Sequence, residues 1–475
     1  MVFSSITFLV YFLPVFLLAY HLVPNRLKNA CILIFSIIFY AWGGPKFIFV
    51  ILGTTLLDFI LVKNMHEAKT QRAKKQLLVV SLLMNLGLLF YFKYSNFFID
   101  NINVLLGTMG IKEITWLKIL LPIGISFYTF ESVTYVVDVY RGVHKPLKNF
   151  WHYQTYILLF PKLIAGPIVR YHDIADQITD REKNYTPDVK LSGFYTFCIG
   201  LAKKVIIANT IGAQADDVFK LDPSQLNTAA AWTGALAYTF QIYFDFSGYS
   251  DMAIGLSKIM GFRLPENFRN PYLASSITEF WRRWHITLGS WMKNYLYIPL
   301  GGNRVSSAAK LYRNLFIVFL LSGLWHGASW NFIIWGAFHG LFLVLERLFL
   351  LNIYDKTGKI VSTVLTFLIV VVGWVYFRIE DLGYANHVVK TMFSFQFFDS
   401  KFAPHNDFYF SLGLAAFFSF FACTAFTRNI QARVYGEQQT QLSQGLLLTM
   451  SILLFYISLS YIAALDFNPF IYFRF

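Results

Sequence analysis

Two histidines, each preceded by tryptophan, are the side chains of this sequence best suited to proton transfer. His285 ends the segment Phe280–His285 (FWRRWH), and His326 lies within Ser322–Asn331 (SGLWHGASWN). Imidazole has an unperturbed pKa near 6.5, so it can accept a proton close to pH 7. The two histidines therefore indicate acid–base chemistry in this part of the chain.

His326 is predicted to lie in the middle of a membrane span. It stands about a dozen residues from either end of an apolar run, and ionisable side chains at that depth usually face a bundle interior or a wet cavity. On one continuous helix, Ser322, Ser329 and Trp330 would share its face, because residues three or four positions apart are neighbours. The alternative is a structural histidine bonded to a neighbouring helix.

His285 is predicted on an amphipathic helix, where Trp281, Leu288 and Met292 can share its face. By itself this pattern is also typical of an interfacial helix, with tryptophan at the membrane boundary and arginine toward the head groups. Cationic side chains beside a histidine suit a phosphorylated ligand. Three cations lie elsewhere on that helix: Arg282, Arg283 and Lys293.

Asp245 is an acid within an apolar, aromatic run, 241–251. We expect it to support the site, and an ion pair with a buried lysine or arginine is an equally good interpretation. The candidate partners are Lys162, Lys203, Arg282 and Arg283. No His-x-x-x-His pair or Cys/His cluster occurs, so no metal site is predicted.

The elements that position these residues are membrane helices. Hydrophobic residues make up 56% of the chain and charged residues 14%, against about 25% charged in soluble domains. Apolar runs of roughly 20 residues recur from end to end, which predicts an all-α polytopic membrane protein with about 11 or 12 spans plus re-entrant or amphipathic helices. The net charge of +14 is explained by basic loops between spans, and nothing favours nucleic-acid binding.

We expect a single membrane domain with three regions: peripheral spans over 1–150, a catalytic core over 151–350, and C-terminal spans with an aromatic tail over 351–475. The basic loop 63–76 predicts a cytoplasmic position for that loop and an outside position for Met1. The apolar segment 153–168 contains two prolines and a glycine, so it is predicted to be broken or re-entrant.

Several motifs resemble those of the membrane-bound O-acyltransferase family, and within it the bacterial alginate O-acetyltransferase type. They occur in order along the chain: MVFSS at 1–5, FPKLIAGPI at 160–168, YFDFSGYSD at 243–251, PENF at 265–268, FWRRWH at 280–285, YIPLGGNR at 297–304 and WHGASWN at 325–331.

This resemblance implies a multi-span fold around a funnel or tunnel, an acyl thioester as donor and a hydroxyl as acceptor. His326 matches the family's invariant histidine, and His285 matches the second active-site histidine of this subfamily. Our hypothesis makes His326 the general base, while His285 orients the acceptor or the thioester carbonyl. Supporting roles fall to Asp245, Ser322, Trp325 and Asn331.

The expected donor substrate is acetyl-CoA, with no bound cofactor, and its phosphates would meet Arg282, Arg283 or Lys293. The expected setting is the bacterial cytoplasmic membrane and its lipid bilayer. The acceptor is a polysaccharide such as alginate, reached directly or through a periplasmic or extracellular acetyltransferase partner. Two alternatives stay open: a D-alanyl transferase of the teichoic-acid type, and a transporter or channel that uses the intramembrane polar cluster.

The C-terminal tail, 466–475, resembles an aromatic tail found in some of these acyltransferases and in small proteins of the teichoic-acid system. There the tyrosine, here Tyr472, is proposed to carry the acyl group. The other interpretation of the tail is an aromatic anchor at the membrane interface.

Overall fold

Helices account for the regular structure of the chain. The computed structural model describes residues 1–397 and 402–464, and no strand occurs within these ranges. In lipid, a helix satisfies every backbone N–H and C=O inside its own segment, so long apolar runs fold this way. The predicted all-α polytopic class is confirmed.

The described part of the chain has fewer helices able to cross a membrane than the sequence predicted. Within the described ranges, eight helices are long and apolar enough to cross a membrane, or nine if the bent pair Phe408–Cys423 and Ala425–Tyr435 forms one span. The predicted span at 6–22 is a shorter apolar helix, Thr7–Leu22. The span expected at 119–137 begins only at Ile125, after an extended segment. Helices that are short or begin late therefore account for part of the difference from the 11 or 12 predicted spans.

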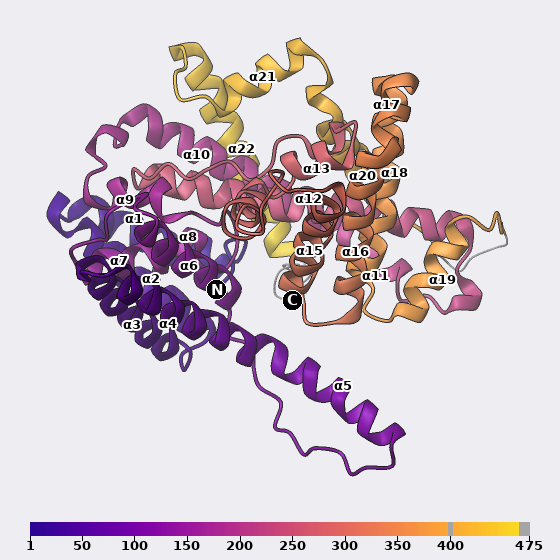
Figure 1. Ribbon diagram of the computed structural model, residues 1–475. Coiled ribbons are helices and arrows are strands. Elements are labelled where there is room, and N and C mark those ends of the chain that lie inside the picture. The colour runs from indigo at the N-terminus through magenta and orange to yellow at the C-terminus, as the bar shows by residue number, and fades with distance from the viewer. Residues whose placement is uncertain (398–401, 465–475) are drawn as a thin grey trace. The chain divides into compact units, whose positions relative to one another are not determined.

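The described chain divides into two compact units. The first contains Met1, Thr7–Lys183 and Phe262–Leu264, and the second contains Val2–Ile6, Asn184–Gly261 and the chain from Pro265 onward. The helices of the first unit (Figure 1) are α1 Leu13–Leu22, α2 Lys28–Gly43, α3 Ile48–Glu67, α4 Gln71–Leu89, α5 Ser95–Thr108, α6 Ile125–Tyr140, α7 Phe150–Leu158, α8 Phe160–Leu163 and α9 Tyr171–Thr179.

A buried ion pair organises the first unit. Lys162 of the four-residue helix α8 pairs with Glu131 of α6, and both side chains are almost completely buried. The same carboxylate accepts the backbone N–H of Val169 at 3.3 Å, in the non-helical stretch that follows α8. The predicted break in 153–168 is confirmed, and the buried carboxylate satisfies backbone that a helix would otherwise have satisfied.

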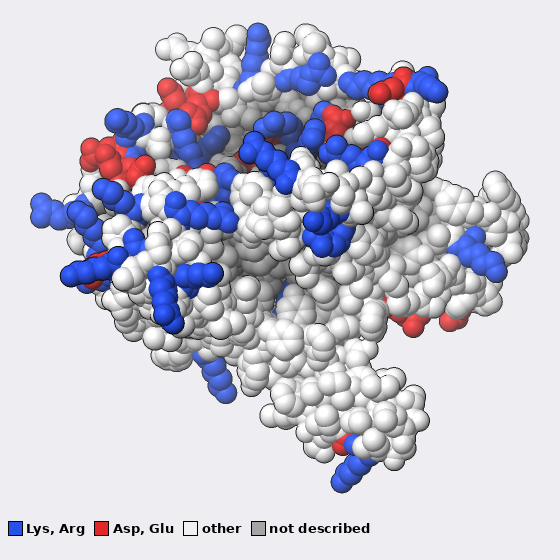
Figure 2. Space-filling view, viewed as in Figure 1, with Lys and Arg blue, Asp and Glu red and all other residues white. Residues whose placement is uncertain are grey.

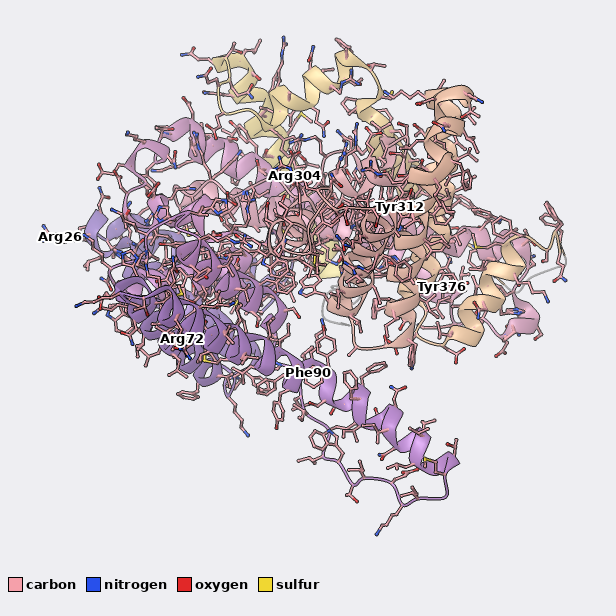
Figure 3. All side chains as sticks on the ribbon, viewed as in Figure 1. Arg26, Arg72, Phe90, Arg304, Tyr312 and Tyr376 are labelled. Carbon is pink, nitrogen blue, oxygen red and sulfur yellow. The ribbon has the colours of Figure 1, made fainter. Side chains whose placement is uncertain are left out.

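One continuous helical segment, Gln71–Thr108, contains α4 and α5. Figure 3 labels Arg72, the second residue of α4, and Phe90, the residue that follows its end. A segment of 38 residues is about 57 Å long at 1.5 Å per residue, well beyond a ~30 Å hydrocarbon core. Part of it must therefore extend past the hydrocarbon region.

The second unit holds both histidine motifs. Its helices (Figure 1) are α10 Pro187–Ala202, α11 Thr210–Val218, α12 Thr228–Ile259, α13 Ile277–Arg283, α14 Ile286–Trp291, α15 Ala308–His326, α16 Trp330–Leu345, α17 Leu351–Thr357, α18 Lys359–Arg378, α19 Leu382–Met392, α20 Phe408–Phe420, α21 Ala425–Tyr435 and α22 Gln441–Ala464. Figure 2 shows lysines and arginines gathered over α13, α17 and α21.

The centre of the second unit is α12, a 32-residue helix that is buried along most of its length. It packs closely on α10 because glycines meet at two levels: an added Cβ on Gly200 would lie 2.5 Å from the Gly248 carbonyl oxygen, and one on Gly255 would lie 2.5 Å from that of Gly193. Small residues at such crossings let helix backbones approach. The close contact holds α12, and with it Asp245, in a fixed place.

The helices α15 and α16 are joined by a tight break at 327–329. His326 is the last residue of α15, and Ser329 is the N-cap of α16. The prediction of His326 in the middle of a span, with Ser329 and Trp330 on the same helical face, was wrong. Apolar periodicity continues across the break, so the hydrophobic pattern alone does not show it.

Close packing at Gly323 holds the α15–α16 pair together. A Cβ there would overlap the Phe332 carbonyl oxygen, so Gly323→Ala should lower the thermal midpoint of the detergent-purified protein, whereas Gly53→Ala should not. Gly53 also lies inside a helix, α3, but nothing is within 4 Å of its added Cβ, and alanine is about 1 kcal/mol the better helix former. Equal effects of the two variants would contradict this packing.

Candidate active site

His285 lies at a break between two short helices. Its backbone has φ 45° and ψ 53°, the left-handed conformation, which is uncommon for a residue other than glycine. Two backbone hydrogen bonds hold the break: Arg269 N–H to Arg283 O and Ile286 N–H to Asn267 O, both 2.9 Å. The predicted continuous amphipathic helix through His285 was wrong, because pairing with the 267–269 segment interrupts it.

The His285 ring is buried and anchored by Asn267. Its Nδ1 lies 3.0 Å from Asn267 Oδ1, and the Phe246 ring of α12 packs edge-on at 4.7 Å between centroids. Burial lowers the pKa of His285 to about 3, so the imidazole is neutral near pH 7. A neutral ring carries one N–H and one lone pair, and its hydrogen bonds decide which nitrogen has which.

His326 is enclosed by aromatic rings. The Trp335 ring of α16 and the Phe377 ring of α18 pack edge-on against it, with centroids 5.1 and 5.2 Å away. Trp325 contacts both imidazoles, at 5.0 Å from His326 and 6.2 Å from His285. The structure thus brings the two tryptophan–histidine motifs together around one indole, although they come from separate elements.

A cavity of about 430 Å³ opens beside His285 and receives residues from α13, α14 and α15. Its walls are largely apolar, with Leu288, Val318 and Phe319 among them, and Ser322 also lines it. His326 is not among its lining residues. An apolar cavity with a few placed polar groups is the usual form of a small-molecule site, so this is the candidate substrate cavity.

Three cations line the cavity: Arg282, Lys293 and Arg347. All three are exposed, whereas His285 is buried, so the charges lie toward solvent and the imidazole lies within. No aspartate or glutamate is among the described residues that line the cavity. A cationic lining without a carboxylate favours an anionic ligand such as a phosphate ester.

Arg283 points elsewhere. Its guanidinium pairs with Glu279 one turn earlier at 2.6 Å, and it is not a lining residue of the cavity. The helix α13 is held by Glu346, whose carboxylate accepts the backbone N–H groups of Ile277 and Thr278. A carboxylate at a helix N-terminus is favourable, and here it fixes the helix that carries Arg282.

Two other predicted residues, Asn331 and Asp245, bond groups that hold helices together. Asn331 accepts a hydrogen bond from the Ser329 hydroxyl and donates to the Tyr376 carbonyl at 3.3 Å, so it ties α16 to α18. Asp245 forms a buried ion pair with Lys204. A buried lysine or arginine partner was expected, but Lys204 was not among the four candidates. Tyr472 lies outside the described residues.

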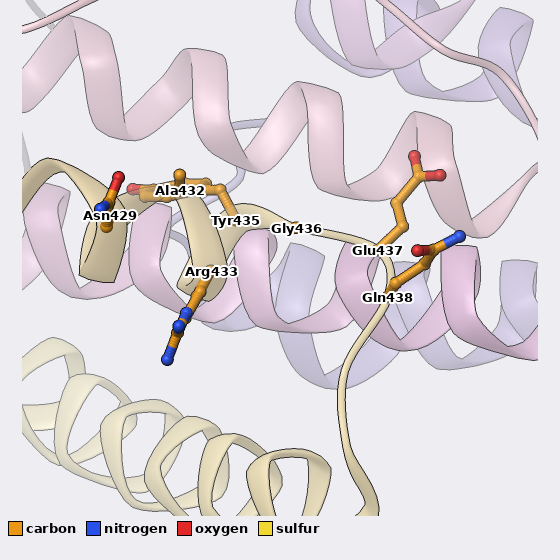
Figure 4. A pocket seen from close by; sticks show the side chains of 7 residues that line it. All are labelled: Asn429, Ala432, Arg433, Tyr435, Gly436, Glu437 and Gln438. Atoms are coloured by element: carbon orange, nitrogen blue, oxygen red, sulfur yellow. The ribbon is translucent and has the colours of Figure 1, made fainter.

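A second hollow, of about 660 Å³, lies on the surface along the end of α21. Figure 4 shows its lining side chains, with Arg433 directed away from Glu437. Its residues are Asn429, Ala432, Arg433, Tyr435, Gly436, Glu437 and Gln438. It holds none of the predicted site residues, so it is a weaker candidate than the cavity beside His285 despite its greater volume.

Sequence reasoning missed Asn267, Lys204, Glu346 and Arg347. Asn267 lies in the PENF motif, which carried the family resemblance without a role for any of its residues. Glu346 and Arg347 follow an apolar run and look like the solvated end of a span. Glu346 acts through its hydrogen bonds to α13, and Arg347 through its place at the cavity, and no local pattern indicates either.

Comparison with known proteins identifies the family of the chain. The sequence model of the membrane-bound O-acyltransferase family matches residues 144–380. The chain is 48% identical to a probable alginate O-acetylase of Pseudomonas aeruginosa over 83% of this chain and 75% of that protein. With the Pseudomonas putida counterpart, identity is 42% over the whole of both chains.

A peptidoglycan O-acetyltransferase of Helicobacter pylori is 36% identical over 82% of this chain and 80% of its own length. Similarity to a teichoic acid D-alanyltransferase of Bacillus subtilis is lower, 29% over 50% of this chain and 60% of that protein.

The Lys204–Asp245 pair should be a large contributor to stability. Asp245→Asn leaves a buried lysine without its carboxylate, which should cost about 3–5 kcal/mol and lower the thermal midpoint strongly. The double variant Lys204→Met with Asp245→Leu should recover part of this loss. The neighbouring pair Lys203–Asp251 is less buried, so Lys203→Met is the control and should cost less; equal losses would contradict the assignment.

Proposed function

The chain belongs to the membrane-bound O-acyltransferase family and is a multi-pass membrane O-acyltransferase, and on this premise we propose that it acetylates a polysaccharide. Acetyl-CoA is the donor and reaches the cavity from the cytoplasm. The acceptor is a hydroxyl outside the cytoplasmic membrane, on an exopolysaccharide of the alginate kind or on a partner acetyltransferase.

The observation that carries the donor proposal is the distribution of charge along the cavity. Exposed Arg282, Lys293 and Arg347 meet the anionic end of an elongated thioester, the apolar wall of Leu288 and Val318 contacts its stem, and His285 lies beside the reacting end. Phosphate groups form strong charge-assisted hydrogen bonds with arginine and lysine. Arg347 replaces Arg283 in the predicted set of donor-binding cations.

The reaction needs a base because a hydroxyl is a poor nucleophile until its proton is removed. The hydroxyl oxygen attacks the thioester carbonyl carbon, a C–O bond forms and the C–S bond breaks. We assign removal of the hydroxyl proton to His326, from which the proton passes to the departing thiolate sulfur. The neutral His285 ring orients the reactants.

The named activities of the relatives support acetyl transfer over D-alanyl transfer. Alginate O-acetylases match most or all of the chain, whereas the D-alanyltransferase matches half of it. Acetyl release from acetyl-CoA by purified protein, with no ion gradient present, would separate the enzyme from a transporter. Activity only with a D-alanyl carrier-protein thioester would favour the other donor.

His326→Gln should reduce acetyl transfer by about 10²–10⁴-fold, the contribution of a positioned base, with little change in the thermal midpoint. The assay measures radiolabelled acetyl moved from acetyl-CoA to alginate oligosaccharides. His387→Gln is the control, because that ring lies on α19 and, in the part of the chain that the structure describes, bonds the Pro223 carbonyl and the Thr391 hydroxyl. A His326→Gln protein with the native rate would exclude His326 as the base.

Arg282→Gln should raise the KM for acetyl-CoA about tenfold or more, since a charged hydrogen bond contributes about 1.5–3 kcal/mol. Its neighbour supplies the matched control: Arg283→Gln removes the same charge one residue away, but from a side chain that pairs with Glu279. We expect the KM of the control to change far less. Equal increases would mean that the overall charge matters and the cavity contact does not.

A further inference from the structure

We propose that Asn267 is a positioning residue that holds His285 in the tautomer with its proton on Nδ1, so that Nε2 presents a lone pair toward the cavity. His285 then orients a substrate amide, or a substrate hydroxyl other than the one that His326 deprotonates, by accepting its hydrogen bond, and it does not polarise the thioester carbonyl. The role of the tautomer in acetyl transfer rests on the proposed function, whereas the tautomer itself does not.

The hydrogen bonds of Asn267 identify its side-chain atoms. One terminal atom receives the backbone N–H of Thr287 at 3.4 Å and the Thr287 hydroxyl at 2.9 Å. A backbone N–H only donates, so that atom is the amide oxygen. The other atom is then the nitrogen, which donates to the Ser250 hydroxyl at 3.1 Å. The amide is therefore held in one orientation by groups from α12 and α14.

This orientation decides the tautomer of His285. Nδ1 lies 3.0 Å from the amide oxygen, which can only accept, so Nδ1 carries the hydrogen. A neutral imidazole has one N–H, and Nε2 is consequently bare. Nε2 is buried, and no hydrogen-bond partner for it lies among the described residues. Because the ring lines the cavity, we assign a ligand bound there as the partner of this lone pair.

A bare nitrogen selects between the two roles that the sequence left open. It accepts from an O–H or N–H, but it cannot donate to a carbonyl oxygen or to the oxyanion that develops from it. The depressed pKa of His285 keeps the ring in this neutral form over the working range of pH. The amides of the donor's stem, and hydroxyls of the acceptor other than the one that His326 deprotonates, are the groups that His285 can orient.

Asn267 also sets the backbone of His285. The backbone carbonyl of Asn267 accepts the Ile286 N–H at 2.9 Å. One residue therefore fixes both the left-handed turn, through its backbone, and the His285 ring, through its side chain. An amide suits this position because it is neutral. An aspartate would keep the oxygen but add a negative charge, which would favour the imidazolium and a proton on Nε2.

The first test is a double-mutant cycle on the full-length protein, read as acetyl transfer from acetyl-CoA. Asn267→Ala should lower kcat by about 10–100-fold, the range in which partners of this kind act, with little change in the KM for acetyl-CoA. In a His285→Ala background the same change should have little further effect. An equal loss in both backgrounds would mean a merely structural role and would overturn the proposal.

The second variant, Asn267→Asp, keeps the hydrogen-bond geometry and serves if the alanine variant fails to fold. The carboxylate should raise the pKa of His285, so activity should fall as pH drops through that raised pKa and recover at higher pH, where Nε2 is bare again. The wild type should show no inflection from His285 between pH 5.5 and 8.5. A pH-independent loss would contradict the tautomer role.

The third readout does not depend on activity. In ¹⁵N-histidine-labelled protein, the signals absent from His285→Gln belong to this ring, and they should show a protonated Nδ1 and a bare Nε2. A protonated Nε2 overturns the proposal. If the tautomer is as expected but acetyl-CoA is not turned over, the proposed function fails while the positioning by Asn267 stands.

Discussion

The short backbone pairing of 267–269 with 283–286 is the interaction on which the site depends. Two hydrogen bonds interrupt the helix that the sequence pattern would continue, and they place His285 in the left-handed region. Such a conformation costs of order 1–3 kcal/mol, and the pairing, together with the ring's bond to Asn267, offsets it. The pairing therefore fixes the backbone from which the His285 ring reaches the cavity.

Charge in the second unit is divided between pairs that hold the fold and cations that remain at the cavity. Two ion pairs balance their own charges: Lys204 pairs with Asp245, and Arg283 pairs with Glu279. Arg282, adjacent to Arg283 in sequence, lines the cavity. Successive side chains on a helix point about 100° apart, so neighbours with the same charge can have opposite uses. The buried, neutral His285 complements this cationic entrance.

Close helix packing supplies the rigidity that a site of this kind requires. Glycines let α12 contact α10 and let α15 contact α16, and aromatic rings fill the space around the two histidines. Trp325 contacts both imidazoles, so a shift of α15 would move its contacts with both. Residues held by several packed elements keep the precise geometry that proton transfer and substrate orientation need.

Composition and periodicity alone determined the membrane class and the all-helical fold, because lipid imposes long apolar helices on any sequence that crosses it. The sequence also indicated both histidines and the family. Tertiary structure decided where helices stop: apolar periodicity runs unbroken through His326 and His285, yet both lie at helix breaks, and at His285 the pairing with 267–269 imposes the break. It likewise decided which cations stay at the cavity and which nitrogen of His285 is bare, since Asn267 and Arg347 reach the site only through folding.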